Sequence, residues 1–356
     1  MPVRRKHSRP AAAGRQIRSR KELHIEICAG DDSVQSPVPN GLERYRFSHE
    51  AVPEVDLTNV DTSTRLFRKT LQAPLMISPM TGGTPLAHRI NLNLAEAAEE
   101  TGIAMGVGSQ RSGIVNPELA YTYQVRKAAP SIFLFANLGA VQLNYGFGAD
   151  ECRRAVEMIE ADALFLHLNP LQEALQEGGD TNFAGLLEKI EKVCRSLSVP
   201  VFAREVSSGI SERSARRLIS AGIAGLDTGG LGGTNWALVE GAANPENRNI
   251  ARLFGDWGHD VASSLINVRN VNRRIPLIAS GGLRNGREAA TAIGLGATLA
   301  STGGGLLNAA RKSSKTVSHQ IGQIIRELRV ALFCAGFASA NEARGALLSK
   351  SSSAMA

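Results

Sequence analysis

Cysteine is scarce in this chain, and its spacing is uninformative. Cys28, Cys152, Cys194 and Cys334 stand far apart, and none belongs to a CxxC pair. This pattern argues against a disulfide framework and against a zinc site. The thiols are therefore expected to be reduced, which predicts a cytoplasmic protein.

Long hydrophobic runs are also absent. No apolar stretch approaches the roughly 18 residues that a membrane-spanning helix needs. The first residues contain no apolar segment of the kind found in a secretion signal. The sequence therefore predicts neither a membrane span nor export.

Charge of one sign is concentrated at the N-terminus of a chain whose net charge is +7. The first 21 residues carry eight basic side chains: Arg4, Arg5, Lys6, Arg9, Arg15, Arg18, Arg20 and Lys21. Such a run is typical of a solvated arm, and we predict a disordered arm over residues 1–19. Aromatic residues make up only 5% of the chain and are not interleaved with the basic ones, so no nucleic-acid partner is expected. A smaller anion, a phosphorylated substrate or cofactor, fits better.

Short apolar runs recur along the chain, separated by segments with helical patterning. Eight runs are expected to be strands: 74–79, 103–109, 132–137, 163–169, 199–205, 224–228, 275–280 and 297–302. Helices are expected over 87–101, 151–161, 183–197, 211–221 and 287–295, with Ser211 as an N-cap, and again beyond the last strand. This alternation predicts a single (β/α)8 barrel domain over 20–350, with barrel strands from about 74 to 302. A doubly wound sheet is the alternative, but the first strand leads into Met80-Thr81-Gly82-Gly83 rather than a dinucleotide fingerprint.

Glycine-rich segments follow the last three predicted strands: DTGGLGGTNW, SGGLRNG and STGGG. Glycine lets the backbone approach a ligand closely, and the late loops of a barrel are a common phosphate site. Thr234, Ser280, Ser301 and Thr302 add hydroxyl donors, so we predict a phosphate site here. No Walker motif is present, which argues against nucleotide triphosphate hydrolysis.

A polar cluster follows the fourth predicted strand in the stretch ALFLHLNPLQE, where His167, Asn169, Gln172 and Glu173 lie within seven residues. The carboxylate of Glu173 is suited to a magnesium ion that bridges substrate phosphates. Glu205 and Asp227 are less distinctive, and each is expected to pair with Arg204 or another cation inside the barrel.

Six motifs occur in an order that resembles the type 2 isopentenyl diphosphate isomerases: RKELHIEI, MISPMTGG, MGVGSQR, HLNPLQE, LGGTNW and IASGGLRNG. The resemblance runs from about residue 20 to 310. It implies a TIM barrel that uses reduced FMN and Mg²⁺, often with NADPH as electron donor. It further implies that the protein interconverts isopentenyl and dimethylallyl diphosphate by protonation and deprotonation of the alkene.

The resemblance also implies roles for individual residues. Gln172 and His167 are the expected catalytic residues, and Glu173 is the expected Mg²⁺ ligand. The expected diphosphate ligands are Arg20, Lys21, His24, Arg111 and Asn169. The expected flavin contacts are Met80, Thr81, Ser109, Asn137, Arg204, Thr234, Gly281, Gly282, Ser301 and Thr302.

The chain departs from the family pattern in places. Arg204 stands where the family usually has a lysine that contacts the flavin; arginine keeps the charge but is wider and cannot be deprotonated. His259 and Asp260 stand where the family has other residues, in a segment that reads WGHDV here and WGIPT in the family. They are either a new acid–base pair or surface polar residues.

Four functions remain open from the sequence. The first is isopentenyl diphosphate isomerisation, and the second is isomerisation or cyclisation of a longer prenyl diphosphate by the same protonation. The third is an FMN-dependent oxidoreductase of the hydroxy-acid type, and the fourth is a non-catalytic barrel that binds prenyl phosphate. A barrel whose N-terminal arm reaches the site also predicts a homo-oligomer.

Overall fold

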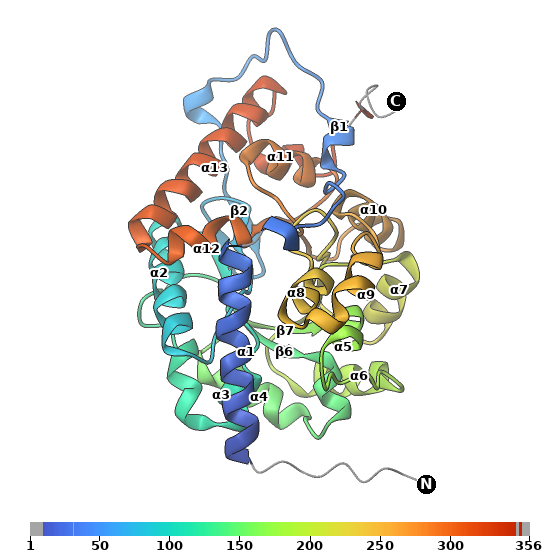
Figure 1. Cartoon of the computed structure of the whole chain (residues 1–356). Coiled ribbons are helices and arrows are strands. Elements are labelled where there is room, and N and C mark those ends of the chain that lie inside the picture. Colours follow the sequence, from blue (N-terminus) through green and yellow to red (C-terminus); the bar gives the residue numbers. More distant parts are fainter. Residues whose placement is uncertain (1–9, 31, 347–348, 351–356) are drawn as a thin grey trace.

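Eight parallel strands form a closed barrel surrounded by helices (Figure 1). The computed structural model describes residues 10–30, 32–346 and 349–350. Around the barrel the order is β10-β11-β4-β5-β6-β7-β8-β9. The strands are β4 (Leu75–Ile77), β5 (Ala104–Gly106), β6 (Leu134–Gly139), β7 (Ala163–Leu168), β8 (Val201–Glu205), β9 (Gly225–Asp227), β10 (Leu277–Ala279) and β11 (Leu299–Thr302). The (β/α)8 prediction is confirmed, and each strand lies within or next to its predicted run.

Alternate residues of each strand point into the barrel, as strand geometry requires. On β7, Phe165 belongs to the interior cluster, whereas Leu164 and Leu166 belong to the layer between strands and helices. Phe165 stacks on Phe135 of β6, with ring centroids 4.2 Å apart. The interior is therefore filled by an apolar layer that is rich in phenylalanine, called here the aromatic layer, and residues two positions further along, such as His167, point inward above it.

A hairpin closes the N-terminal end of the barrel. It consists of β2 (Thr64–Leu66) and β3 (Lys69–Leu71), which pair antiparallel. At its turn, the Phe67 ring lies 6.1 Å from that of Phe133 and 6.0 Å from that of Phe202, measured between centroids. The second small sheet pairs β1 (Tyr45–Arg46) with β12 (Ser349–Lys350).

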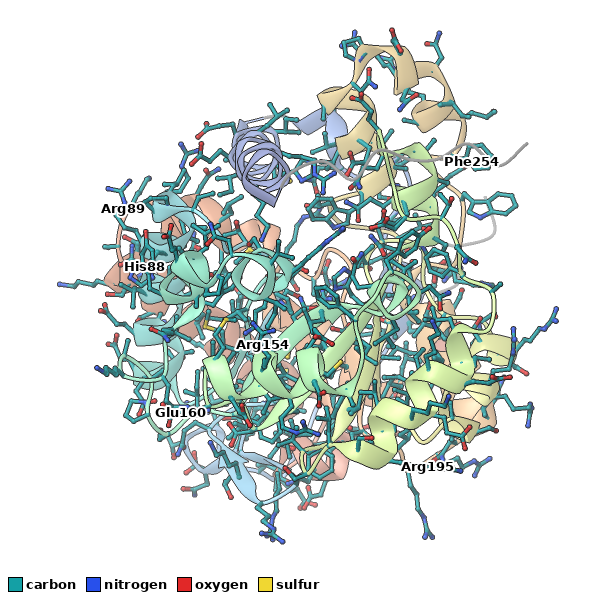
Figure 2. The ribbon with its side chains drawn as sticks, turned by 90° about the horizontal axis from the view of Figure 1, so that it is seen from below. His88, Arg89, Arg154, Glu160, Arg195 and Phe254 are labelled. Carbon is teal, nitrogen blue, oxygen red and sulfur yellow. The ribbon has the colours of Figure 1, made fainter. Side chains whose placement is uncertain are left out.

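The outer helices bury one face and leave the other to solvent. They are α2 (Pro85–Thr101), α3 (Arg111–Val115), α4 (Ala149–Met158), α5 (Pro170–Leu175), α6 (Leu186–Ser196), α7 (Glu212–Ser220), α8 (Trp236–Ala243), α9 (Arg248–Leu253), α10 (Val261–Val271), α11 (Gly286–Gly294) and α12 (Gly304–Ala310). On α6, Leu186, Ile190 and Val193 are buried, while Arg195 lies at the outer surface (Figure 2). Ser211 caps α7 by accepting a hydrogen bond from the Ser214 N–H, which confirms that prediction. The helices α8, α9 and α10, which follow β9, were not predicted.

The chain closes with α13 (Ser314–Cys334) and α14 (Ala340–Ala343). α13 packs against α2 and α11. Ile321, Ile324, Leu328 and Leu332 form its buried stripe, which confirms the predicted C-terminal helix. Within the described ranges, no helix combines the length and apolar character that crossing a membrane requires.

The N-terminal region differs from the prediction. Helix α1 spans Pro10–Gly30 and so includes residues 10–19 of the predicted disordered arm, whereas residues 1–9 of that arm lie outside the described residues. The physical reason is composition: residues 10–19 include alanine, arginine and glutamine, which favour helices, alongside their charges. The helix contacts α3, α8 and α12 and stands across the barrel (Figure 1).

Candidate active site

A cavity of about 270 Å³ opens at the carboxyl ends of the barrel strands, beneath α1. Nearly all the predicted site residues line it: Arg20, Lys21, His24, Met80, Thr81, Ser109, Arg111, Asn137, His167, Asn169, Gln172, Glu173, Arg204, Thr234, Gly281, Gly282 and Ser301. Thr302 does not line the cavity. Because residues of a strand alternate, Ser301 of β11 faces the interior and Thr302 faces the helix layer.

His167 is a half-buried, neutral imidazole near the end of β7. Its Nδ1 lies 2.9 Å from the Asn137 Oδ1, and the Asn137 side-chain amide donates to the Val107 carbonyl at 3.1 Å. Burial lowers the pKa of His167 to about 3, and the charges of Arg204, Lys21 and Arg111 add to this effect. With the Asn137 oxygen as acceptor, Nδ1 carries the proton and Nε2 keeps a free lone pair.

A chain of hydrogen bonds fixes the amide of Gln172. The Asn169 Nδ2 donates to Gln172 Oε1 at 3.0 Å, and Gln172 Nε2 donates to Glu240 Oε1 at 2.8 Å. His24 Nε2 lies 3.6 Å from the same Glu240 oxygen. The oxygen and the nitrogen of the Gln172 side-chain amide therefore each have a fixed partner.

Glu240 does not line the cavity but contacts Gln172 and His24, which do, and it was not predicted from the sequence. Gln142, Gln176 and Trp236 line the cavity and were not predicted either. Burial by itself raises the pKa of Glu240, but the nearby His24 ring, the hydrogen bond from Gln172 and the charge of Arg20 outweigh burial, so this pKa lies below its ordinary value. The sequence feature that could have indicated Glu240 is that it is the one acidic residue in the otherwise apolar run WALVEGAA of α8.

Glu173 is buried at the start of α5, with 6% of its surface exposed. Oε1 accepts from Asn169 Nδ2 at 3.1 Å, and Oε2 accepts from the Asp180 N–H at 2.7 Å. Burial raises the pKa of Glu173, although these hydrogen bonds act in the opposite direction. The nearby Asn169 Oδ1 is buried without a hydrogen-bond partner.

These oxygens fit a Mg²⁺ ion only in part. Glu173 and Asn169 offer a carboxylate and an orphaned carbonyl oxygen, which are ligand types that Mg²⁺ prefers. The described part of the chain holds no cluster of three or more His, Cys, Asp or Glu residues that could bind a metal. A bound Mg²⁺ would therefore depend on water and phosphate oxygens for its remaining ligands.

Cationic side chains come to the cavity from two directions. Arg20 and Lys21 belong to α1, and Arg111 begins α3. Arg111 Nη1 binds Asp180 Oδ2 at 2.9 Å, and Gln142 donates to the same oxygen at 3.1 Å. These contacts hold Arg111 at the wall of the cavity.

Glycines form the opposite wall, where the loops after β9, β10 and β11 meet. Gly281 and Gly282 have φ angles of +127° and +81°, and a Cβ on either would overlap the carbonyl of Gly230 or Gly232. A Cβ on Gly304 would lie 3.1 Å from the Thr234 hydroxyl. Only glycine permits this packing, and the resulting cradle of backbone and hydroxyl groups is suited to a phosphate group such as that of FMN.

Arg204 and Asp227 form a buried ion pair between β8 and β9. Asp227 also accepts a hydrogen bond from the Ser280 hydroxyl. The Arg204 guanidinium carbon lies 5.8 Å from the centroid of the Phe165 ring. The expectation that Asp227 pairs with Arg204 is therefore confirmed.

The expectation that Glu205 pairs with a cation is wrong. Glu205 accepts hydrogen bonds from the backbone N–H groups of Ser207, Ser208 and Gly209, and so shapes the loop after β8. Burial raises the pKa of Glu205 to about 8 in spite of these bonds. The physical reason is strand alternation, which turns Arg204 inward and Glu205 outward.

The raised pKa of Glu205 predicts a pH-dependent stability. Because the folded state holds this proton more tightly than the unfolded chain, Glu205 stabilises the fold below about pH 4.5, and this contribution is lost as pH rises toward 8. We expect Glu205→Gln to reduce the fall in the free energy of unfolding between pH 5 and 8, measured by urea denaturation. Replacement of the exposed Glu246 by Gln serves as control. The prediction would be contradicted if the free energy of unfolding falls equally with pH in the wild type and in Glu205→Gln.

His259 and Asp260 lie outside the cavity. Asp260 caps α10 by accepting from the Ser263 N–H at 2.7 Å, and it pairs with Arg44 at 2.8 Å. His259 is exposed. These positions fit surface polar residues rather than a new acid–base pair.

Comparison with known proteins identifies the family. A family model described as FMN-dependent dehydrogenase matches residues 13–117 and 186–350. An isopentenyl-diphosphate delta-isomerase of Nostoc sp. is 49% identical over 329 residues, which are 92% of this chain and 94% of that protein. The same-named protein of Stutzerimonas stutzeri is 49% identical over 323 residues, covering 90% and 93% of the two chains. This chain belongs to the FMN-dependent (type 2) isopentenyl-diphosphate delta-isomerase family.

Solved structures with the same fold include a mandelate oxidase and a lactate oxidase. A mandelate oxidase variant with a monooxide FMN adduct superposes with a TM-score of 0.65 at 20% identity, covering 96% of this chain and 99% of that one. A lactate oxidase of Pediococcus acidilactici gives 0.64 at 16% identity, covering 98% and 96%. At these identities the likeness shows the fold alone.

Proposed function

We propose that this chain interconverts isopentenyl and dimethylallyl diphosphate, with reduced FMN and Mg²⁺ bound and NADPH as electron donor. The observation that carries the proposal is the division of one cavity into three walls. A glycine cradle forms one wall, the cations Arg20, Lys21 and Arg111 form another, and the neutral side chains of His167 and Gln172 lie on strand β7 and helix α5. The names of the relatives support the same reaction.

The residues of the cradle fit FMN. Gly281, Gly282 and Thr234 would hold its phosphate, while Met80, Thr81, Ser109, Asn137 and Ser301 would line its ring. Bound in reduced form, FMN would supply an electron-rich ring and an exchangeable proton. Arg204 would add a fixed positive charge beside it, held in place by Asp227.

The remaining residues bind and orient the substrate. Arg20, His24, Arg111 and Asn169 would hold the diphosphate, and Lys21, whose ammonium contacts the barrel, would add its charge. Glu173 would hold a Mg²⁺ ion, which would supply positive charge to the diphosphate. Binding energy gained at this end positions the alkene at the other. Gln172 and His167 are then the groups at the reacting carbon, and both are neutral, so they hydrogen-bond and exclude water rather than act as strong bases.

Nuclear magnetic resonance tests this proposal directly. Isopentenyl diphosphate is incubated anaerobically in D2O with purified protein, FMN, Mg²⁺ and NADPH. We expect dimethylallyl diphosphate to appear with deuterium incorporated, and no product without NADPH. If flavin is bound and reduced but the substrate stays unchanged and takes up no deuterium, the proposal fails; geranyl and longer diphosphates would then be tested in the same assay.

A hydroxy-acid oxidoreductase is the second candidate, because the matching family model is described as an FMN-dependent dehydrogenase. That chemistry requires a base beside the flavin, and the lowered pKa of His167 suits it poorly for this role. Bleaching of oxidised flavin by lactate or mandelate without NADPH would favour this candidate. Failure to bind flavin after careful reconstitution would instead favour a non-catalytic prenyl-phosphate-binding barrel.

We further propose a cytoplasmic homo-oligomer without a nucleic-acid partner. Light scattering coupled to size-exclusion chromatography measures the oligomeric state, and a single-chain mass would contradict this part of the proposal.

A further inference from the structure

Tyr123 is a fully buried polar side chain next to the cavity, and the proposed function gives it no role. It ends the short helix η4 (Pro117–Tyr123). Its hydroxyl lies 2.6 Å from the Lys21 Nζ, donates to the Ser109 carbonyl at 2.8 Å and lies 2.6 Å from the Ser112 Oγ. A buried hydroxyl with this many partners is part of a specified network.

The ammonium group of Lys21 is the centre of this network. Its Nζ donates to the Ser109 carbonyl at 2.9 Å, to Ser112 Oγ at 3.1 Å and to the Tyr123 hydroxyl at 2.6 Å. An ammonium has three N–H donors, so all three are engaged by the barrel before any ligand binds. Nζ also lies 5.2 Å from the centroid of the Tyr123 ring, within range of a cation–π contact. Lys21 thereby attaches α1 to the loops after β5.

The glycines of the MTGG motif leave space for Tyr123 and Ser112, which bind the Lys21 ammonium. A Cβ on Gly82 would overlap the Tyr123 ring, and a Cβ on Gly83 would overlap the Ser112 hydroxyl. On the other side, a Cβ on Gly113 would lie 3.2 Å from the ring. The MTGG motif, in which Met80 and Thr81 are expected flavin contacts, therefore also encloses Tyr123.

We propose that Tyr123 is a positioning residue for the substrate diphosphate. Together with Ser112 and the Ser109 carbonyl, it fixes the Lys21 ammonium and, through it, the part of α1 that presents Arg20 and His24 to the cavity. The identity of the ligand rests on the proposed function, whereas the attachment of α1 does not. Burial and the charges of Arg20 and Arg111 lower the pKa of Lys21 to about 7, whereas acceptors in contact with an ammonium favour its charged form.

The variant Tyr123→Phe tests the proposal, because it removes one hydroxyl and keeps the ring that fills the core. We expect KM for isopentenyl diphosphate to rise roughly tenfold, the size of a lost hydrogen bond to a charged group. The value of kcat should change little, because His167 and Gln172 are untouched. Tyr121→Phe, on the same helix but exposed, is the matched control and should leave both constants unchanged. In a Lys21→Met background, Tyr123→Phe should have no further effect.

Hydrogen–deuterium exchange supplies a readout that needs no activity. In flavin-loaded protein without substrate, backbone amides of residues 20–28 should exchange faster in Tyr123→Phe than in the wild type or Tyr121→Phe. Ser112→Ala should give the same change and serves if Tyr123→Phe does not fold. Unchanged exchange, or a loss of kcat at constant KM, would overturn the proposal. A wild type without isomerase activity would refute the proposed function, while the exchange data would still decide the attachment of α1.

Discussion

Replacing Glu173 with glutamine is expected to lower kcat/KM for isopentenyl diphosphate by roughly a hundredfold or more, the loss expected when a metal site is disrupted. The change removes a negative charge and keeps the size of the side chain. Glu173 is the carboxylate that we propose for Mg²⁺, and its neighbour Asn169 contributes a neutral oxygen. A neutral amide would therefore leave the proposed Mg²⁺ without a negatively charged protein ligand.

The isomerase assay by nuclear magnetic resonance, repeated over a series of Mg²⁺ concentrations, measures this effect. We expect a higher Mg²⁺ requirement in Glu173→Gln, with flavin content unchanged because the glycine cradle is formed by other loops. Glu177→Gln, an exposed residue in the same loop region, is the control. Wild-type activity and an unchanged Mg²⁺ requirement in Glu173→Gln would remove Glu173 from the proposed metal site.

Replacing Asp227 with asparagine is expected to lower the free energy of unfolding by about 3–5 kcal/mol, the usual cost of breaking a buried ion pair by removing one partner. Asp227 is fully buried and is the ion-pair partner of Arg204. Its loss leaves the guanidinium buried without a counter-charge. Guanidinium chloride unfolding of the flavin-free protein measures the change, and flavin affinity should fall as well because Arg204 and Ser280 line the cavity.

Two further variants make this test specific to the charge pair. Asp256→Asn changes an exposed carboxylate on the chain segment after α9 and should leave stability within about 0.5 kcal/mol of the wild type. The double change of Arg204→Met with Asp227→Leu removes both charges, and it should be more stable than Asp227→Asn alone. If Asp227→Asn unfolds at the wild-type denaturant concentration, the ion pair does not stabilise this fold.

The barrel could be predicted because parallel strands are buried on both faces and therefore read as short apolar runs. Most site residues could be predicted because they directly follow such runs. Thr302 could not be excluded from the site, since one residue of register decides whether a side chain faces the interior or the helices. The same alternation separates Arg204 from Glu205.

Residues from segments outside the strands were harder to place. Glu240 and Tyr123 lie on α8 and η4, and their approach to the cavity depends on how these helices pack rather than on local pattern. The arm was predicted to be disordered from its charges, although its alanine, arginine and glutamine residues also favour a helix. Tertiary contacts with α3, α8 and α12 add to this preference.

The aromatic layer inside the barrel determines how molecules reach the cavity. Phe67, Phe133, Phe135, Phe165 and Phe202 fill the interior from the hairpin end upward. Among the described residues, this layer fills the barrel on the hairpin side of the cavity, so no molecule reaches the cavity through the barrel interior. Arg20, Lys21 and Arg111 line the cavity, so their positive charges attract anions to it and disfavour cations.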